Sequence, residues 1–386
     1  MTADKSVADR VQAIFECNFV RGVELGASVA VWQDGQQAFC FCQGWRDAAR
    51  NALWIHDTMV LVWSATKGLS SACVLHALEG AGRDLSTPVS EFWPEFAQNG
   101  KGKITVAEVV SHRAGLSALI DKTADVRDHD AVIRAIESQA PLWENRNEHG
   151  YSPRLYGYLA DEFVRRLGGR PLGEYWRTNF GEPMELDLWI GLPESLHHRA
   201  AQMIAARAGC GDVEDEFFQA MATPGSLTRE AFSTPSGSIS PSAMNSPALR
   251  SASLPSLGAI GSAESLAKFY AMLSLGGEWE GRRYFSPGAV DWMTTRLAQG
   301  IDITLRTETA FSAGFMLDPL DASGRKKRHI FGPSNSAFGH PGAGGSLAFA
   351  DPENRLGFAY VMNQMEAGVL PKSRALSLVH ALYDFP

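Results

Sequence analysis

The sequence has no run of apolar residues long enough to cross a membrane, and its first ten residues lack the apolar core of a signal peptide. Its 386 residues include only five cysteines, an odd number without metal-ligand spacing: Cys17, Cys40, Cys42, Cys73 and Cys210. Disulfides are rare in reducing compartments, so we expect reduced thiols and a location in the cytoplasm.

Basic residues are also fewer than acidic ones. Lys and Arg number 35 against 43 Asp and Glu, which gives a formal net charge of −8. Such a chain is poorly suited to nucleic acid or to an anionic membrane surface. The longest basic run, residues 325–328, is expected to be an exposed hairpin tip and not a binding patch. The expected partner is a small-molecule substrate, and the oligomeric state stays open.

Several motifs of catalysis and ligand binding are absent. There is no Gly-x-Ser-x-Gly elbow of the α/β-hydrolases and no His-Glu-x-x-His of zinc proteases. The glycine-rich run at 342–345 lacks the Gly-Lys-Ser/Thr ending of a phosphate-binding loop. The adjacent residues His197 and His198 would face different directions on a helix. We therefore expect no metal and no cofactor.

Hydrophobic periodicity places strands near both ends and helices in the middle. A helix with Val7, Val11, Ile14 and Phe15 on one stripe opens the chain, and residues 28–32 and 37–42 form a hairpin. Residues 59–63 read as a short buried strand, and 232–255 as a long ordered loop. Helices are expected at 64–80, 105–112, 128–139, 155–167, 198–207, 262–275, 287–299 and 371–383, and further strands at 310–316, 344–350 and 356–362.

This distribution predicts an α+β fold. One antiparallel sheet would be assembled from both ends of the chain and flanked by helices, with a mainly helical region inserted. The predicted domains are a sheet domain of residues 1–80 plus 251–386 and a helical inserted domain of residues 81–250.

Ser64 and Lys67 carry the most specific chemical signal. An apolar stretch ends in Ser64, and Lys67 follows three residues later on the expected helix, so the hydroxyl and the amine share one face. A lysine in a water-poor pocket can take the proton of a serine hydroxyl and make it a nucleophile. The alternative is that Ser64 only caps the helix.

The Ser-x-x-Lys pattern occurs twice more, and the context separates the three. Ser265 precedes Lys268 inside an amphipathic helix, and Ser323 precedes Lys326 in a polar loop. Only Ser64 begins a helix after a buried strand, where the first helical N–H groups and the positive end of the helix dipole would surround its oxygen.

Two other segments could complete a site for acyl transfer. Tyr151 lies between Gly150 and Pro153, where a phenol could pass protons between the lysine, the serine and a leaving group, or simply pack in a turn. Residues 338–346 are rich in glycine beside a strand, which lets a ligand lie along the backbone, although a plain tight hairpin would look the same.

Together these segments resemble the serine β-lactamase and penicillin-binding-protein superfamily, and most closely its family VIII carboxylesterases, which share the class C β-lactamase fold. The resemblance covers nearly the whole chain. The similar segments, in order, are Trp63-Ser-Ala-Thr-Lys67, 104–116 with His112-Arg-Ala-Gly-Leu116, His149-Gly-Tyr151, Trp189-Ile-Gly-Leu-Pro-Glu194, 338–346 and Asp351-Pro352.

The resemblance implies a role for each matching residue. Ser64 would be the acylated nucleophile, Lys67 its base, and Tyr151 the tyrosine that helps to deprotonate the serine and later activates water. The backbone N–H groups of Ser64 and Ala343 would form the oxyanion hole. The candidate substrate-binding residues are Trp63, His340 and Gly342, the last two at the position of the Lys-Thr-Gly of β-lactamases.

Two departures from the family pattern bear on the substrate. The Tyr-x-Asn of class C enzymes reads Tyr151-Ser152-Pro153, and the lysine of the third motif is His340. Both changes weaken the interpretation as a lactamase or peptidase and favour neutral esters and a neutral Tyr151. We therefore predict a serine carboxylesterase for small, short-acyl esters. A β-lactamase or D-amino-acid peptide hydrolase on the same scaffold, or a non-catalytic binding protein, are the alternatives.

Overall fold

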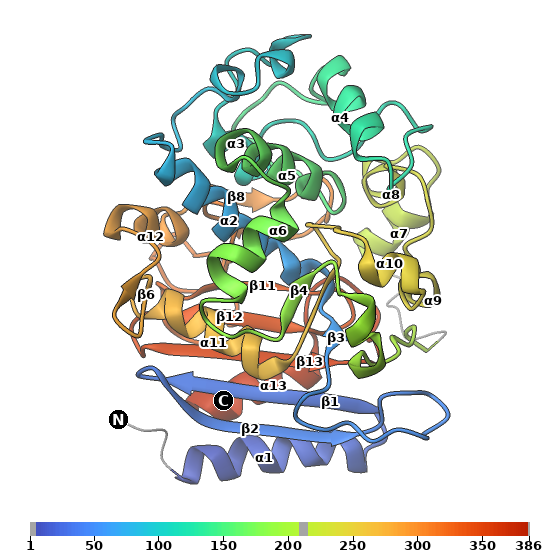
Figure 1. The fold of residues 1–386 in the computed structure, drawn as a ribbon, viewed down its shortest axis with the longest axis vertical. Helices are drawn as coiled ribbons and strands as arrows, with labels where there is room; N and C mark the ends of the chain where they lie inside the picture. The colour runs from blue at the N-terminus through green and yellow to red at the C-terminus, as the bar shows by residue number, and fades with distance from the viewer. Residues whose placement is uncertain (1–4, 208–214, 385–386) are drawn as a thin grey trace.

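An antiparallel sheet of eight strands lies at the centre of the computed structural model, which describes residues 5–207 and 215–384 (Figure 1). The strand order is β2-β1-β13-β12-β11-β10-β9-β8. The strands are β1 (Gly26–Gln33), β2 (Gln36–Gly44), β8 (Ala298–Ile301), β9 (Glu308–Phe311), β10 (Met316–Leu317), β11 (Phe338–Pro341), β12 (Leu347–Asp351) and β13 (Leu356–Met362). Residues 26–44 and 298–362 therefore build one sheet, which confirms the predicted sheet from both ends of the chain.

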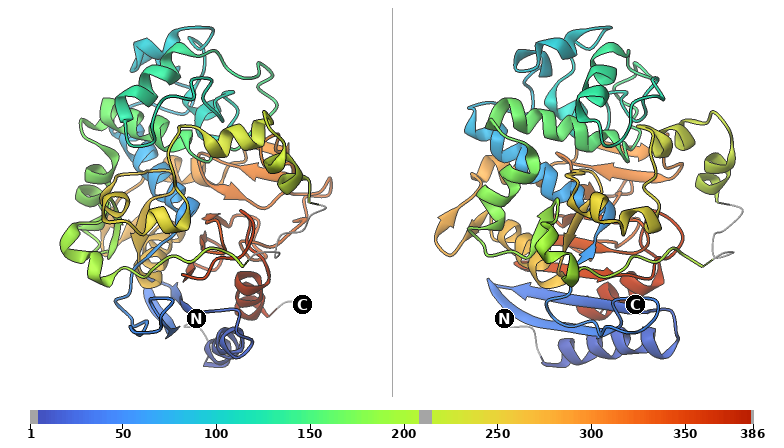
Figure 2. Two further views of the ribbon diagram at one scale, coloured as in Figure 1. Left: turned by 90° about the vertical axis from the view of Figure 1, so that its right-hand side faces the viewer. Right: turned by 45° about the vertical axis from the view of Figure 1, so that its right-hand side comes forward.

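Helices cover both faces of the sheet, as the packing of β13 shows. Every residue of this strand is buried and nearly all are apolar, which is typical of a strand with two covered faces. Phe358 and Tyr360 pack with α1 (Lys5–Val20) and α13 (Ser373–Tyr383), whereas Ala359 and Val361 pack with α11 (Ala263–Ser274). The two alternating sets place α1 and α13 on one face and α11 on the other, as the two turned views also show (Figure 2).

Helix α2 (Thr66–Gly80) lies between the sheet and the helices above it. It is buried on almost every side and packs against α5 (Leu155–Gly168) and β11. The other helices are α3 (Val106–Val110), α4 (His129–Ser138), α6 (Leu172–Trp176), α7 (Glu216–Ala222), α8 (Leu227–Ser233), α9 (Pro241–Met244), α10 (Pro247–Ser251) and α12 (Pro287–Thr294). Short helical turns are η1 (Trp63–Ala65), η2 (Val89–Glu91), η3 (Pro94–Ala97), η4 (Arg177–Gly181) and η5 (Glu194–Arg199).

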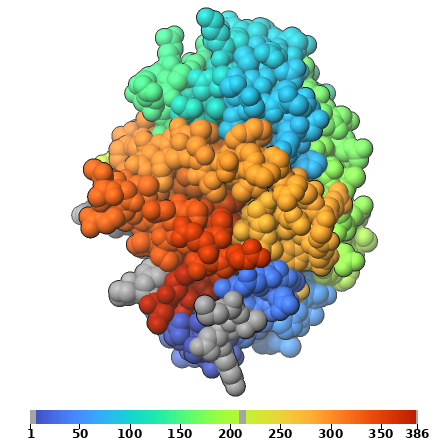
Figure 3. Space-filling view, turned by 90° about the vertical axis from the view of Figure 1, so that its left-hand side faces the viewer, coloured from blue at the N-terminus to red at the C-terminus, as the bar shows by residue number. Residues whose placement is uncertain are grey.

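A second sheet has three strands, and one of them, β3 (Val60–Leu61), directly precedes η1 and the helix α2 in the chain. The strands of this sheet are β3, β5 (Ala259–Gly261) and β4 (Leu188–Ile190), in that order, and a small hairpin pairs β6 (Glu278–Trp279) with β7 (Arg282–Arg283). In the space-filling view the cyan residues lie at the top, the orange and red residues toward the C-terminus lie in the middle, and blue residues toward the N-terminus lie below them (Figure 3). The division into two domains at residues 81 and 250 stays a prediction.

Two predicted helices are wrong in whole or in part. Residues 198–207 are helical only up to Arg199, in η5, because the segment then runs extended: Ala201 donates to the Met59 carbonyl, and Ile204 bonds to Asn363 and Met365. The helix expected at 287–299 ends at Thr294, and Ala298–Ile301 forms β8 instead. The strand expected at 310–316 is two strands, β9 and β10, joined by a turn.

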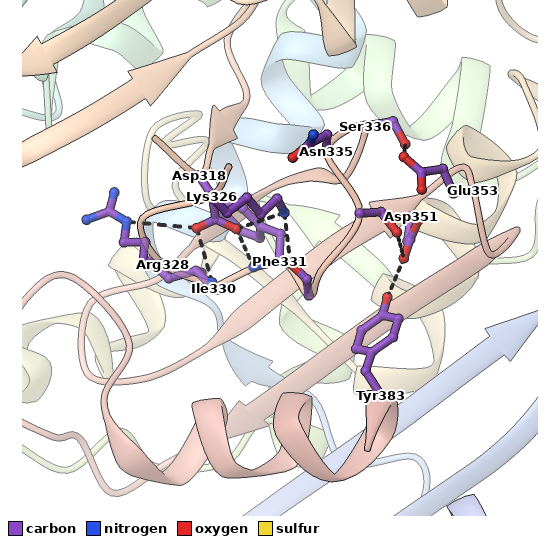
Figure 4. A network of polar contacts seen from close by, with 12 residues as sticks. Asp318, Lys326, Arg328, Ile330, Phe331, Asn335, Ser336, Asp351, Glu353 and Tyr383 are labelled. Atoms are coloured by element: carbon purple, nitrogen blue, oxygen red, sulfur yellow. Dashed lines mark hydrogen bonds and ion pairs between the residues drawn. The ribbon is translucent and has the colours of Figure 1, made fainter. Parts of the chain in front are cut away.

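The basic run at 325–328 is an exposed tip only in part. The side chain of Arg325 is 82% exposed, but that of Lys326 is 2% exposed and its amine lies 3.1 Å from the Asp318 carboxylate (Figure 4). Arg328 lies 3.8 Å from the same carboxylate. The buried charge of Asp318 turns alternate basic side chains inward, which the sequence pattern does not reveal.

The state of the cysteines and the length of the helices are relevant to the expected location in the cytoplasm. Cys17, Cys40, Cys42 and Cys73 are free thiols, and Cys210 lies outside the described residues. None of the helices in the described part of the chain has the length and apolar character needed to cross a membrane. Location in the cytoplasm stays a prediction.

Candidate active site

Ser64 lies in the turn η1, between the buried strand β3 and the helix α2. Its neighbours Trp63 and Ala65 are buried, whereas Ser64 itself is half-buried. Trp63 has a φ of +50°, a conformation that non-glycine residues adopt only where the surroundings enforce it. Thr66 holds this turn, because its hydroxyl donates to the Trp63 carbonyl at 2.5 Å and accepts the Ala259 N–H at 2.9 Å.

The amine of Lys67 lies beside the Ser64 hydroxyl. Its Nζ is 3.4 Å from Ser64 Oγ and donates to the carbonyls of Pro153 at 2.9 Å and Ser256 at 3.0 Å. Lys67 is 0% exposed, and this burial lowers its pKa well below the usual value for lysine. Once deprotonated, the amine has two N–H groups, which these two carbonyls can take. Its lone pair is then left to face the hydroxyl of Ser64.

Tyr151 covers this pair from a loop outside any helix or strand. The Lys67 Nζ is 4.7 Å from the centroid of the Tyr151 ring, which also stacks on Phe311. Burial raises the pKa of the Tyr151 phenol, and a hydrogen bond with Ser64 opposes that shift only in part. The phenol is therefore protonated at neutral pH and can give or take a proton only through a partner such as Lys67 or Ser64.

His340 and Gly342 come from the end of strand β11 and the turn after it. His340 is 1% exposed, and its ring centroid is 5.9 Å from that of Tyr151. Burial, followed by the charge of Lys67, lowers the pKa of His340 to about 3, so the imidazole is neutral. Its Nδ1 lies 2.7 Å from the Pro341 carbonyl and must carry the proton, which leaves Nε2 with a lone pair.

Gly342 brings the turn with Ala343 next to the backbone before the serine. A Cβ at Gly342 would lie 2.2 Å from the Val62 carbonyl oxygen, so only glycine fits this approach. The half-buried Ala343 follows directly. Trp63, the third predicted substrate-binding residue, is 6% exposed and so offers little surface to a substrate. The oxyanion and substrate-binding roles stay predictions.

Sequence reasoning missed three residues that shape this site. Ser256 supplies a carbonyl to Lys67, Asp302 binds the amide of Tyr151, and His112 contacts the same loop. The long loop expected at 232–255 is wrong, because it contains the helices α9 and α10. Ser256 lies in the short connection between α10 and β5, and Asp302 follows a strand of four residues, so neither has a local signal. His112 was within a segment that resembles the family, but the resemblance gave it no role.

The site has no features of a metal centre. No group of three or more His, Cys, Asp or Glu side chains within residues 5–207 and 215–384 is arranged to hold a metal ion. The chemistry of the described residues is that of a serine, an amine and a phenol.

Comparisons with known proteins give a consistent result. The profile of the Beta-lactamase family matches residues 8–382. The chain is 30% identical over 357 residues to Esterase/beta-lactamase LipL of Mycobacterium tuberculosis, covering 88% of this chain and 77% of that protein. Two crystal structures are similar over 100% of this chain and 98% of theirs. One is a penicillin-binding protein homolog from Caulobacter crescentus (34% identity, TM-score 0.86), the other a family VIII carboxylesterase (30% identity, TM-score 0.87).

Proposed function

This chain belongs to the beta-lactamase family and is a serine hydrolase, and we propose that it is a carboxylesterase for small, uncharged esters with short acyl chains. The observation that carries the proposal is the contact between Ser64 and Lys67. A desolvated amine that donates to two carbonyls lies 3.4 Å from a half-buried hydroxyl. That arrangement provides a base for a serine nucleophile.

In the proposed reaction, Lys67 Nζ accepts the Ser64 proton while Oγ forms a bond to the ester carbonyl carbon. The backbone N–H groups of Ser64 and Ala343 would stabilise the oxyanion, and donors of this kind contribute about 100- to 1,000-fold each. When the C–O bond of the ester breaks, the alcohol leaves with a proton from the Lys67/Tyr151 pair. Water then gives a proton to the same pair and attacks the acyl carbon. The bond between that carbon and Oγ breaks, Oγ takes the proton back from the pair, and the acid leaves.

Two features favour a neutral ester over a β-lactam or a peptide. His340, at the position of the third-motif lysine, is neutral at physiological pH and so offers no cation to a substrate carboxylate. Pro153, at the position of the family's asparagine, has no side-chain amide for the side chain of a lactam. Ester hydrolysis needs neither group, since its leaving alcohol and its acyl group carry no charge.

A substrate panel tests this proposal. We expect hydrolysis of p-nitrophenyl acetate and butyrate, a decline with longer acyl chains, and little turnover of nitrocefin or of a D-Ala-D-Ala peptide. Intact-mass measurement with a fluorophosphonate should show one label, on Ser64. Faster turnover of nitrocefin or the peptide would reassign the enzyme, and acylation without turnover would indicate a binding protein.

Ser64→Ala should abolish both hydrolysis and labelling. The matched controls are Ser265→Ala and Ser323→Ala, which alter the other two Ser-x-x-Lys serines. Ser265 accepts the amide of Asp187, and Ser323 is an exposed partner of Asp321. Both variants should keep full activity, and turnover that survives Ser64→Ala would exclude the mechanism.

A further inference from the structure

Asp302 is a fully buried carboxyl group that takes no part in the reaction proposed above. Its two oxygens accept the N–H of Tyr151 at 3.1 and 3.0 Å, and Oδ1 also accepts those of Thr304 and Leu305 at 2.8 Å each. The Thr309 hydroxyl donates to Oδ2 at 3.3 Å. Among the described residues its one ion-pair contact is with His149, at 3.9 Å, so it is stabilised almost wholly by neutral donors.

A buried carboxyl without a cation is costly, and natural structures keep one where it binds several donors. Burial raises the pKa of Asp302 to about 6, against the opposing effect of its hydrogen bonds. It is therefore ionised at neutral pH. Of its donors, Thr304 and Leu305 belong to its own turn, and Tyr151 is the long-range one, 151 residues away.

The loop of Tyr151 has all three of its successive amides bound by buried polar groups. The Gly150 N–H donates to the His112 carbonyl at 3.0 Å and the Ser152 N–H to His112 Nδ1 at 3.3 Å, on either side of the contact with Asp302. His112 itself has a φ of +62°, a strained conformation for a non-glycine residue. A loop without regular structure is thus fixed at three consecutive residues.

These hydrogen bonds fix the backbone at residue 151. This matters because the phenol is at the far end of the Tyr151 side chain. A small backbone rotation at residue 151 would carry the hydroxyl away from Ser64 and from Lys67. Proton transfer requires heavy atoms within about 3 Å, and misplacement by about 1 Å can cost about 100-fold in rate.

We propose that Asp302 is a positioning residue, which holds the Tyr151 phenol against Ser64 and Lys67 by binding the Tyr151 amide. The proposal rests on the function proposed above, because it assigns Tyr151 to proton transfer in ester hydrolysis. It predicts that Asp302 acts only through the tyrosine.

A double-mutant cycle tests this dependence. Asp302→Asn keeps the shape of the side chain but replaces an acceptor oxygen with an NH₂ group. It should lower kcat for p-nitrophenyl acetate by about 10- to 100-fold with KM within about threefold, since the substrate itself is not contacted. In a Tyr151→Phe background there is no hydroxyl to position, so Asp302→Asn should cost no further activity.

Asp318→Asn is the matched control. Asp318 is also buried and accepts two backbone amides, those of Ile330 and Phe331, each at 3.1 Å (Figure 4). Because Met316 pairs with Gly339, Asp318 extends toward Ala337 and away from the turn at Gly342. This variant should lose thermal stability but retain kcat. Amide hydrogen exchange at 150–152 should increase in Asp302→Asn and stay unchanged in Asp318→Asn.

Three results would overturn the positioning role: a folded Asp302→Asn with normal kcat, losses that add in the double variant, or unchanged exchange at 150–152. If Asp302→Asn does not fold, Thr309→Val replaces it. It removes one donor to Asp302 together with the contact of that hydroxyl with His149 Nε2 at 2.8 Å, and its loss of kcat must also vanish in Tyr151→Phe. Failure of the proposed function would look different, because Ser64 of the unaltered protein would then take no label.

Discussion

The backbone carbonyl of Pro153 accepts a hydrogen bond from the Lys67 amine at 2.9 Å. Pro153 is the residue at which the Tyr-x-Asn pattern of class C enzymes departs from this sequence. Together with the carbonyl of Ser256, it accepts hydrogen bonds from the Lys67 amine. The lysine is thus oriented by main-chain acceptors, and the loss of the asparagine side chain does not leave it without a partner.

A main-chain acceptor makes the side chain at 153 dispensable for the chemistry. We expect Pro153→Ala to keep at least about half of kcat, and to lower the free energy of unfolding by about 0.4–1 kcal/mol because the unfolded chain gains freedom. Steady-state kinetics and urea denaturation would measure the two effects. A loss of kcat of tenfold or more in the folded variant would show that the proline ring itself matters.

In contrast to Pro153→Ala, replacing the amine of Lys67 should abolish most of the activity. Lys67→Met keeps an unbranched apolar stem, one atom shorter, and removes the base, so acylation of Ser64 should slow by at least about 100-fold. The rate of p-nitrophenol release and the intact mass after fluorophosphonate treatment would measure it.

Lys101→Met is the matched control for the loss of a buried amine. Lys101 is also 0% exposed and donates to the carbonyls of Gln98, Glu137 and Gln139, far from Ser64 in sequence and among other helices. Its removal should cost about 1–3 kcal/mol of stability and leave kcat unchanged. Equal losses of activity in the two lysine variants would contradict a role for Lys67 as the base.

The fold could be predicted where an element carries its own signal. The amphipathic α1 and α13, the β1–β2 hairpin around Asp34-Gly35 and the apolar β13 were all expected near their observed positions. Strands β10 and β11 have two and four residues, and β11 contains Gly339 and Pro341. Such short segments become strands because neighbouring strands bind them, which no local pattern encodes.

The same distinction applies to the site. Ser64 and Lys67 are three residues apart, so the sequence alone places them together. Ser256 is 189 residues from Lys67, and Asp302 is 151 residues from Tyr151. Their contacts depend on how loops cross in the folded chain, so only the structure reveals what orients the lysine and the tyrosine.

The buried imidazole of His340 should make the protein sensitive to acid. Burial and the charge of Lys67 lower its pKa from 6.5 to about 3 in the folded state. Between these values the unfolded state binds a proton that the folded state does not, so the free energy of unfolding falls as the pH falls. The slope for one such group is about 1.4 kcal/mol per pH unit.

His340→Asn should remove this part of the slope. Asparagine can still donate to the Pro341 carbonyl but does not titrate. Urea denaturation between pH 7 and pH 4 should show a flatter decline in the variant than in the unaltered protein. Identical slopes would mean that His340 is not buried as a neutral ring.

Gly342 couples stability to catalysis at one point of the fold. A Cβ at this position would meet the Val62 carbonyl at 2.2 Å, so Gly342→Ala must push the turn with Ala343 away from the backbone before Ser64. We expect a loss of about 1–3 kcal/mol in stability from overpacking, and a lower kcat because an oxyanion donor would move. In the control Gly80→Ala, at the end of α2, a Cβ meets nothing within 4 Å, so it should stabilise the helix by about 0.5–1 kcal/mol. Unfolding curves and kcat measured on both variants would separate the effects, and a Gly342→Ala enzyme with normal kcat would remove this turn from the oxyanion site.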